Sequence, residues 1–424
     1  MINPRTIKIS DYNYILPDER IAKYPLSERD QSNLLVYRNG QIGQRHFFDL
    51  PELIPAGSMI VFNNTKVIQA RLHFRKPTGG MVEVFCLEPD APKDYQQNFA
   101  AESECQWICL VGNSKKWKEG SLQMEVGLKD GRRTVLYCER AGETGPSQKI
   151  RFHWEGGMSF AQILDAIGEL PIPPYLNRAT EEKDKETYQT VYSRIKGSVA
   201  APTAGLHYTE KELGALKEKG VSLQYLTLHV GAGTFKPVKS ETIEGHDMHT
   251  ESISVPKSVI EAIAAFLKNR RPEARFVATG TTSVRTLESL YYIGEKIAAL
   301  KQEGGFGHIH PEDLVVHQWE PYDYQHTMPV ADAIRQVLEY LTATGQDTLV
   351  TATQILIAPS FRYRLVDTIV TNFHMPQSTL LLLVSAFVDG DNPDGPNWHR
   401  IYRYALDNGF RFLSYGDSSI LFND

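Results

Sequence analysis

The sequence lacks a hydrophobic run long enough to cross a membrane. No stretch of about 18 apolar residues occurs in the 424 residues, and TLLLLVSAFV, which begins at Thr379, is long enough only for a buried helix. The N-terminal stretch MINPRTIKIS lacks the apolar centre of a secretory signal. We therefore expect a cytoplasmic protein without membrane contact.

Cysteine is scarce. Cys86, Cys105, Cys109 and Cys138 are too unevenly spaced for a disulfide framework, which indicates a reducing compartment. The paired Cys-x-x-Cys units of a zinc site are also absent, so zinc binding is the weaker alternative. We interpret the four cysteines as buried thiols, because Cys86 and Cys138 lie inside the strand-like runs VEVFCLE and TVLYCER.

A large excess of one charge sign is also missing. The formal net charge of −6 does not indicate nucleic-acid binding by the chain as a whole. Clusters of Lys and Arg at residues 71–80, 113–120 and 268–275 can each neutralise a few phosphates, but we interpret them first as solvated loops.

Familiar metal-site and catalytic motifs are absent. His246, His249 and Glu251 lie close together in EGHDMHTESISV, yet no His-Glu-x-x-His pattern occurs, so we interpret them as hydrogen-bonded polar residues where a strand begins. The histidines at 308, 310, 317 and 326 match no ligand spacing and are interpreted as part of a solvated loop. The absence of Gly-x-Ser-x-Gly and Gly-x4-Gly-Lys-Ser/Thr excludes serine hydrolases and P-loop proteins.

The chain changes character between residues 71 and 154. Short alternating runs there are separated by Gly-rich or charged turns, which predicts a small antiparallel β-barrel. These runs are GMVEVFCLE, QWICLVG, LQMEVGL, RTVLYCER and KIRFHW. Mixed strands and helices flank them, such as GSMIVFNNTKVI and the helical pattern of residues 159–170. We predict an α/β catalytic domain of residues 1–70 and 155–424, with a β-barrel domain of residues 71–154 inserted.

The stretch VAAPTAGLHYT, residues 199–209, has no charged side chain. Thr209 and Glu212 match a capping box, which predicts a helix that begins there and ends at Gly220. The free N–H groups at a helix start favour an anion, and Gly205 would let a ligand approach the backbone closely.

Two later segments each place a strand directly before a helix. ARFVATG precedes TTSVRTLESL, and RLVDTIVTNF precedes HMPQSTLLLLVSAF, with Ser283 and Ser378 placed to cap the helices. Because ligands of α/β sheets bind outside the carboxyl ends of strands, the residues that follow are expected to line one crevice. They are Thr281, Thr282, Ser283, Arg285, Asn372 and His374. An ion pair of Arg285 with Glu288 on the helix surface is the alternative for that arginine.

A third strand, LTLHV, passes His229 and leads into Gly231-x-Gly233-Thr234. By itself this pattern indicates no more than a bend where a strand ends.

Several long motifs occur in one order between about Asp11 and Asp417, with one interruption. They are YILPDERIAKYPLSERDQSNLLVY, VFNNTKVIQARL, PIPPYLNR, VYSRIKGSVAAPTAGLHYT, LTLHVGAGTFKPV, HDMHTESISV, GTTSVRTLES and TNFHMPQSTLLLLVSAF. In these segments the chain resembles the S-adenosylmethionine:tRNA ribosyltransferase-isomerases of queuosine biosynthesis. The segment 291–353 is longer than the connection usual in that family, so we interpret it as an atypical insertion.

The resemblance implies an α/β domain joined to an inserted β-barrel. It also implies a transferase that moves and isomerises the ribosyl part of S-adenosylmethionine onto 7-aminomethyl-7-deazaguanine at the tRNA wobble position. The products would be epoxyqueuosine-tRNA, adenine and methionine. S-adenosylmethionine is then a co-substrate, tRNA is the partner, no metal or further cofactor is expected, and we expect a monomer.

This chemistry makes demands on the site. The sulfonium acidifies the neighbouring 5′ C–H, so a base that titrates near neutral pH is needed, and a cationic pocket floor would repel the ligand. We predict His207 and His229 as the acid/base pair, and Thr203 as a catalytic residue that positions ribose hydroxyls with Thr234. Arg285 or the helix start at Thr281, Thr282 and Ser283 is predicted to hold the methionine carboxylate. Further predicted substrate contacts are Gly205, Gly231, Gly233, Asn372 and His374.

Two alternatives remain open at this point. The barrel and its basic loops also suit a tRNA-binding protein without catalysis. An RNA methyltransferase that uses S-adenosylmethionine would release S-adenosylhomocysteine, although no methyltransferase-like glycine loop follows a first strand.

Overall fold

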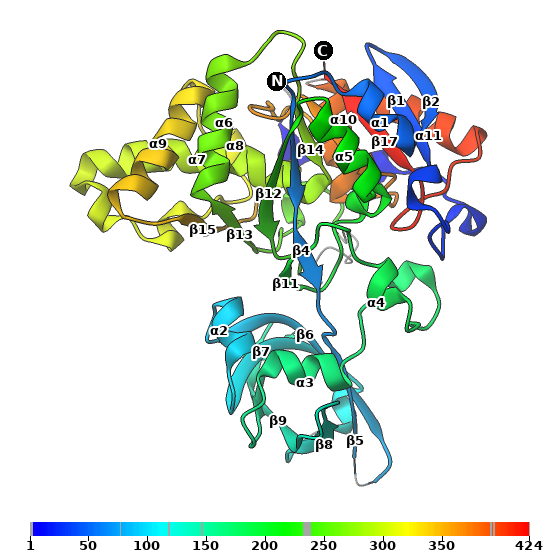
Figure 1. Ribbon diagram of the computed structural model, residues 1–424, viewed down its shortest axis with the longest axis vertical. Coiled ribbons are helices and arrows are strands. Elements are labelled where there is room, and N and C mark those ends of the chain that lie inside the picture. Colours follow the sequence, from blue (N-terminus) through cyan, green and yellow to red (C-terminus); the bar gives the residue numbers. More distant parts are fainter. Residues whose placement is uncertain are drawn as a thin grey trace.

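A computed structural model describes residues 3–76, 78–117, 119–145, 147–231, 238, 240–390, 392 and 395–423. They form a large mixed sheet, a six-stranded antiparallel sheet and, between these, a parallel two-stranded ribbon of β4 and β11 (Figure 1). The large sheet has the order β15 (Thr348–Thr353), β13 (Glu251–Pro256), β12 (Ser222–Leu228), β3 (Met59–Asn63), β14 (Phe276–Thr279), β16 (Thr368–Asn372), β17 (Ser418–Phe422), β1 (Asn33–Arg38) and β2 (Gln41–His46). The ribbon strands are β4 (Thr65–Val67) and β11 (Ile195–Ser198).

Helices cover both faces of the large sheet. The α-helices among the described residues are α1 (Leu50–Leu53), α2 (Tyr95–Ala100), α3 (Phe160–Ile167), α4 (Asp184–Thr187), α5 (Glu210–Glu218), α6 (Lys257–Asn269), α7 (Thr281–Gly304), α8 (Glu320–Asp323), α9 (Val330–Ala343), α10 (Thr379–Asp389) and α11 (Asn397–Asp407). Strand β3 shows why both faces need cover. Met59 and Val61 pack into a core with α6 and α7, whereas Ile60 and Phe62 pack into a second core with α1 and α5.

The four central strands, β12, β3, β14 and β16, run parallel. Their carboxyl ends therefore lie at one edge of the sheet. The outer neighbours β13 and β17 pair antiparallel with β12 and β16. The α/β expectation for this part of the chain is confirmed as a large mixed sheet with helices on both faces.

Two of the three predicted helix caps are present in the structure. Thr209 and Glu212 form the capping box at the start of α5, and Gly220 follows its end with φ +81°. Ser378 caps α10 by accepting a hydrogen bond from the Leu381 amide. The cap predicted at Ser283 is wrong, because α7 begins after Gly280 without a side-chain cap.

The six-stranded sheet is antiparallel and nearly closed. In spatial order its strands are β5 (Arg71–Arg75), β6 (Met81–Ala91), β7 (Glu104–Gly112), β10 (Ser147–His153), β9 (Arg133–Thr144) and β8 (Leu122–Gly127). The edge strands β5 and β8 also contact each other. A separate hydrophobic core fills this sheet and includes residues of α3. The four cysteines are unpaired and buried, as expected, in this part of the chain.

One expectation for this region is wrong. Residues 71–80 were interpreted as a solvated basic loop, but Arg71–Arg75 form β5. Leu72 and Phe74 point into the core while His73 and Arg75 are exposed, so the basic residues belong to the outer face of a strand. The division into an α/β domain of residues 1–70 and 155–424 and an inserted barrel of residues 71–154 stays a prediction.

The segment 291–353 is built into the large sheet and its helices. It contains the second half of α7, all of α9 and strand β15, which pairs with β13. His308, His310 and His317 are exposed, as a solvated loop requires. His326 is different, because it is largely buried and forms an ion pair with Glu295 of α7.

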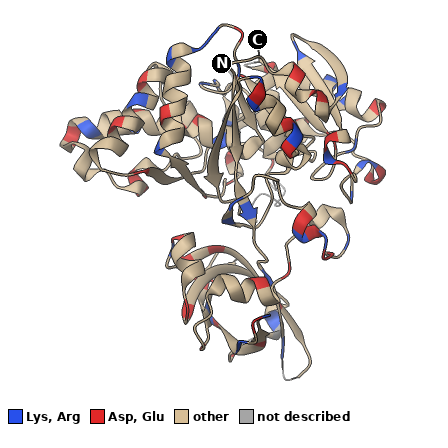
Figure 2. Ribbon diagram, in the orientation of Figure 1, with Lys and Arg blue, Asp and Glu red and all other residues tan. Residues whose placement is uncertain are grey.

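Among the described residues, no helix has both the length and the apolar character needed to cross a membrane. In the view of Figure 2, segments with Lys or Arg alternate with segments of Asp or Glu on the outer helices. This mixture agrees with the small net charge of the chain.

Helix packing in the large part can be tested with two glycines inside helices. A Cβ on Gly294 of α7 would lie 2.2 Å from the Ala333 carbonyl oxygen of α9, whereas a Cβ on Gly214 of α5 would meet no atom within 4 Å. We expect Gly294→Ala to destabilise the protein by about 1–3 kcal/mol. Gly214→Ala should instead stabilise it by about 0.5–1 kcal/mol. Thermal unfolding measures both, and equal shifts would contradict the close packing of α7 on α9.

Candidate active site

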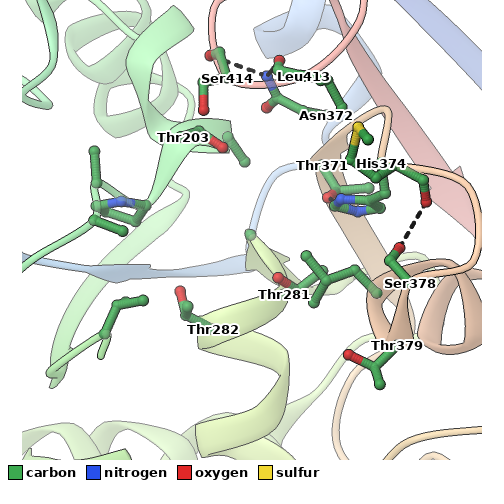
Figure 3. A pocket seen from close by; sticks show the side chains of 18 of the residues that line it. Thr203, Thr281, Thr282, Thr371, Asn372, His374, Ser378, Thr379, Leu413 and Ser414 are labelled. Atoms are coloured by element: carbon green, nitrogen blue, oxygen red, sulfur yellow. Dashed lines mark hydrogen bonds between the residues drawn. The ribbon is translucent and has the colours of Figure 1, made fainter. Parts of the chain in front are cut away.

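A cavity lies where the carboxyl ends of the parallel strands meet. Val230 follows β12, Gly280 follows β14, and Asn372 ends β16, and all three line it. The uncharged loop of residues 200–204 and the loop at Leu413 close the space from other directions. Figure 3 shows the hydroxyl and amide side chains around it, which include Thr203, Thr281, Thr282, Thr371, Asn372 and Ser414. The lining therefore combines apolar residues with hydroxyl and amide groups and has few charged side chains.

Asn63 holds the ends of β3 and β12 together. Its side-chain amide donates to the Leu228 carbonyl at 3.0 Å, and its carbonyl oxygen accepts from the amides of Leu228 at 3.1 Å and Thr65 at 3.2 Å. Only a side chain with both a donor and an acceptor can make this set of bonds. Asn63 thus fixes the strand end from which Val230 reaches the cavity.

The start of α7 supplies the positive end of a helix dipole. Gly280 precedes the helix with φ +83°, and no side chain caps the first turn. Thr281 and Thr282 of that turn line the cavity. The start of α5, by contrast, is closed by its own capping box and does not line the cavity. The helix start suited to an anion is therefore that of α7, not that of α5.

The cavity contains a buried ion pair. Arg285 lines it and pairs through Nη1 with Glu251, and its Nε donates to the Ile355 carbonyl at 3.2 Å. The alternative partner Glu288 is wrong, because its carboxylate accepts the backbone N–H groups of residues 364–366. Since Glu251 offsets the guanidinium charge, the cavity has little net charge. Within the described chain, Nη2 of Arg285 is buried without a hydrogen-bond partner.

His249 completes a chain of three polar residues. Its Nε2 lies 3.1 Å from Oε1 of Glu251, whose other oxygen faces Arg285. The side chain of His249 is 30% exposed and lines the cavity, whereas that of Glu251 is 1% exposed. Glu251 begins β13, which confirms hydrogen-bonded polar residues at a strand start. Residues two apart share one side of extended backbone, and this brings His249 to Glu251.

The two histidines predicted as the acid/base pair do not line the cavity. Nδ1 of His207 lies 2.8 Å from Ser32 Oγ, and its ring packs against Phe47. The ring of His229 stacks on Tyr95 with 4.0 Å between centroids. Burial lowers the pKa of each histidine to about 4. Their catalytic roles stay predictions.

His374 does line the cavity. Its Nε2 lies 3.1 Å from the Thr371 hydroxyl, and burial lowers its pKa to about 4. Thr203, Thr281, Thr282, Arg285, Asn372 and His374 are the predicted residues that the cavity brings together. Their roles toward a ligand also stay predictions.

The remaining predicted residues lie elsewhere. A Cβ on Gly205 would lie 1.8 Å from the Tyr192 hydroxyl oxygen, so protein occupies the space beside this glycine. Gly231 and Ser283 do not line the cavity. Gly233 and Thr234 lie outside the described residues.

Sequence reasoning missed several lining residues. They are Tyr175, Tyr188, Met248, Leu413 and Ser414. Tyr175 lies in PIPPYLNR, and no pattern in that stretch indicates that it contacts the loop at Ser414. A hydrogen bond between the hydroxyls of Tyr175 and Ser414, 2.5 Å long, joins positions 239 residues apart. For His249, the spacing to Glu251 was the one available signal.

The cavity lies at the carboxyl ends of the parallel strands, which is where α/β proteins usually bind small molecules. The model of the queuosine biosynthesis protein family matches residues 9–319 and 320–421, and the chain belongs to this family, as its motifs predicted. The chain is also similar to a protein of known crystal structure, an S-adenosylmethionine tRNA ribosyltransferase from Thermotoga maritima, with 26% sequence identity. That match covers 97% of this chain and 100% of the other, with a TM-score of 0.45. Among the described residues, no three His, Cys, Asp or Glu side chains gather in a way suited to a metal ion.

The buried histidines give an expected pH dependence of stability. The pKa values of His207, His229 and His374 are lowered to about 4, whereas histidine in an unfolded chain titrates near 6.5. Between these values the unfolded chain binds more protons than the folded one. The free energy of unfolding therefore decreases as the pH falls from about 6.5 to about 4, by at most about 1.4 kcal/mol per pH unit for each histidine.

His229→Phe tests this expectation, because phenylalanine keeps a ring on Tyr95 but does not titrate. In denaturant unfolding across that pH range, the slope for the variant should be smaller than for the wild type. His153→Gln is the control, since His153 is partly exposed and paired with Glu139 at 3.3 Å. An unchanged slope in His229→Phe would show that this histidine is not buried in its neutral form.

Proposed function

We propose that the protein transfers and isomerises the ribosyl part of S-adenosylmethionine onto 7-aminomethyl-7-deazaguanine at the wobble position of tRNA. The products are epoxyqueuosine-tRNA, adenine and methionine. The observation that carries this proposal is the neutral, hydroxyl-lined cavity at the carboxyl ends of β12, β3, β14 and β16. Membership of the queuosine biosynthesis family supports the tRNA nucleoside as the acceptor.

The charge of the cavity suits a sulfonium. Two like charges 4 Å apart repel by about 4 kcal/mol at an effective dielectric constant of about 20. An unpaired Arg285 would thus weaken the binding of S-adenosylmethionine considerably. Its ion pair with Glu251 removes most of that repulsion.

The polar groups suit the rest of the ligand. Hydroxyls of Thr203, Thr281 and Thr282 surround the cavity and can bond ribose hydroxyls (Figure 3). The uncapped start of α7 favours the methionine carboxylate, and the buried Nη2 of Arg285 offers it a further donor. Thr203 and the start of α7 keep their predicted roles toward the ribose and the carboxylate, and the ribose contact of the Thr281 and Thr282 hydroxyls is an addition to them.

The six-stranded sheet lies close to the same site. Tyr95, which lies between β6 and β7 in the chain, stacks on His229, and Glu88 of β6 is near enough for the charge of His249 to lower its pKa. Burial nevertheless raises the pKa of Glu88 overall. An acceptor that belongs to a large RNA can therefore contact both sheets while its base reaches the cavity.

Adenine release is the direct test of the proposed function. Purified protein should release adenine and methionine in equal amounts from S-adenosylmethionine when the tRNA has 7-aminomethyl-7-deazaguanine at the wobble position. The same tRNA with guanine at that position is the control and should give no adenine. S-adenosylhomocysteine as the product would indicate a methyltransferase, and tRNA binding without any product would indicate a binding protein.

A further inference from the structure

We propose that His249 is the proton acceptor of this reaction, and that Glu251, held by Arg285, is its positioning residue. This inference rests on the proposed function and assigns a role within the same cavity. It gives His249 the role that the motifs had suggested for His207 and His229, which do not line the cavity. It follows from the geometry around β13.

The carboxylate fixes the form of the imidazole. An ionised carboxylate only accepts hydrogen bonds, so Nε2 of His249, at 3.1 Å from Oε1 of Glu251, has to bear the proton. The lone pair is then on Nδ1, which is the ring nitrogen that can accept a proton from a substrate. The pair is firmly held, because the Glu251 side chain is 1% exposed and its other oxygen is paired with Arg285. Such a second partner orients a histidine and raises its basicity.

The charge balance of the reaction requires an acceptor in the cavity. Starting from the unprotonated amine, the aminomethyl nitrogen forms one C–N bond, and the isomerisation closes a carbocycle and an epoxide through one new C–C and one new C–O bond. In exchange, the C–S bond breaks to give neutral methionine, and the C–N bond to adenine and one ring C–O bond also break. The amine N–H and the 5′ C–H give up two protons, and adenine departs after taking up one of them. Because the sulfonium charge disappears and every product is neutral, one proton remains in excess.

His249 can take this proton without changing the net charge of the site. Before the reaction the sulfonium is positive while His249, Glu251 and Arg285 together are neutral. Afterwards the imidazolium is positive and the sulfonium is gone. Glu251 stabilises the imidazolium directly, since its oxygen lies within hydrogen-bond distance of the ring.

The other histidines near the site are less suited to this task. His207 and His229 do not line the cavity, and burial lowers the pKa of His374. Burial, followed by the charge of His249, lowers the pKa of His246. Among the described residues, the ionisable groups that interact with His249 are Glu251, His246 and Glu88, and Glu251 is itself paired with Arg285.

The test is the pH dependence of adenine release by the full-length protein with modified tRNA. In the wild type, kcat should fall on the acid side as His249 becomes protonated and unable to accept a proton. His249→Gln should lower kcat by about 10²- to 10⁴-fold and abolish that acid limb, while the KM for S-adenosylmethionine changes little. His153→Gln removes another histidine paired with a glutamate, away from the cavity, and should keep the wild-type profile.

Glu251→Gln tests the positioning role. Without the carboxylate, the protonated imidazole loses its charged partner, so the acid limb should move to lower pH while the maximal kcat falls. Because this change leaves the buried Arg285 without its carboxylate and can prevent folding, the double variant Glu251→Gln with Arg285→Met removes both charges. The acid limb of the kcat profile should move to lower pH in the double variant as well. Thermal unfolding serves as the control that each variant is folded.

Two results would overturn the inference alone. One is a His249→Gln protein with wild-type kcat, and the other is a slower His249→Gln protein that keeps the acid limb, because the titrating group would then be another residue such as Glu88. Absence of adenine with the wild-type protein would instead overturn the proposed function, and the inference with it.

Discussion

The buried ion pair between Glu251 and Arg285 joins three parts of the fold at the cavity. Glu251 begins β13, Arg285 lies in the second turn of α7, and the guanidinium also bonds the Ile355 carbonyl beyond β15. Either charge alone would be costly to bury. Together they leave the cavity nearly neutral, place a carboxylate against His249, and keep an arginine available without repelling a cationic ligand.

The sheet explains why the site lies where it does. Four parallel strands end at one edge, so residues from distant parts of the chain meet there, with the loop of residues 200–204 above them. Asn63 bonds the ends of β3 and β12 together, and Gly280 lets α7 begin directly at the cavity. The neutral lining and the helix start thus follow from the order of the strands and from a few residues at their ends.

The sequence predicted those features that depend on neighbouring residues. Capping at Thr209 and the strand ends before Thr281 and at Asn372 are local signals. Five of the six residues predicted from these strand ends therefore line the cavity, and Ser283 is the exception. The positions of His207 and His229 could not be predicted, because they depend on packing against Phe47 and Tyr95, far away in sequence. The hydrogen bond of His249 to Glu251 is local in sequence. The ion pair that holds Glu251 in place, however, involves Arg285, 34 residues further along the chain. The basic residues of Arg71–Arg75 suggested a loop, although buried and exposed residues alternate along this segment as they do in a strand.

We propose that S-adenosylmethionine binds in the neutral cavity with its sulfonium beside the ion pair of Glu251 and Arg285. A crystal structure of the protein with S-adenosylmethionine bound would show this. We expect the methionine carboxylate at the start of α7, the ribose among Thr203, Thr281 and Thr282, and the 5′ carbon on the side of His249. S-adenosylmethionine bound outside this cavity, or with its sulfonium turned away from Glu251 and His249, would show that the proposal is wrong.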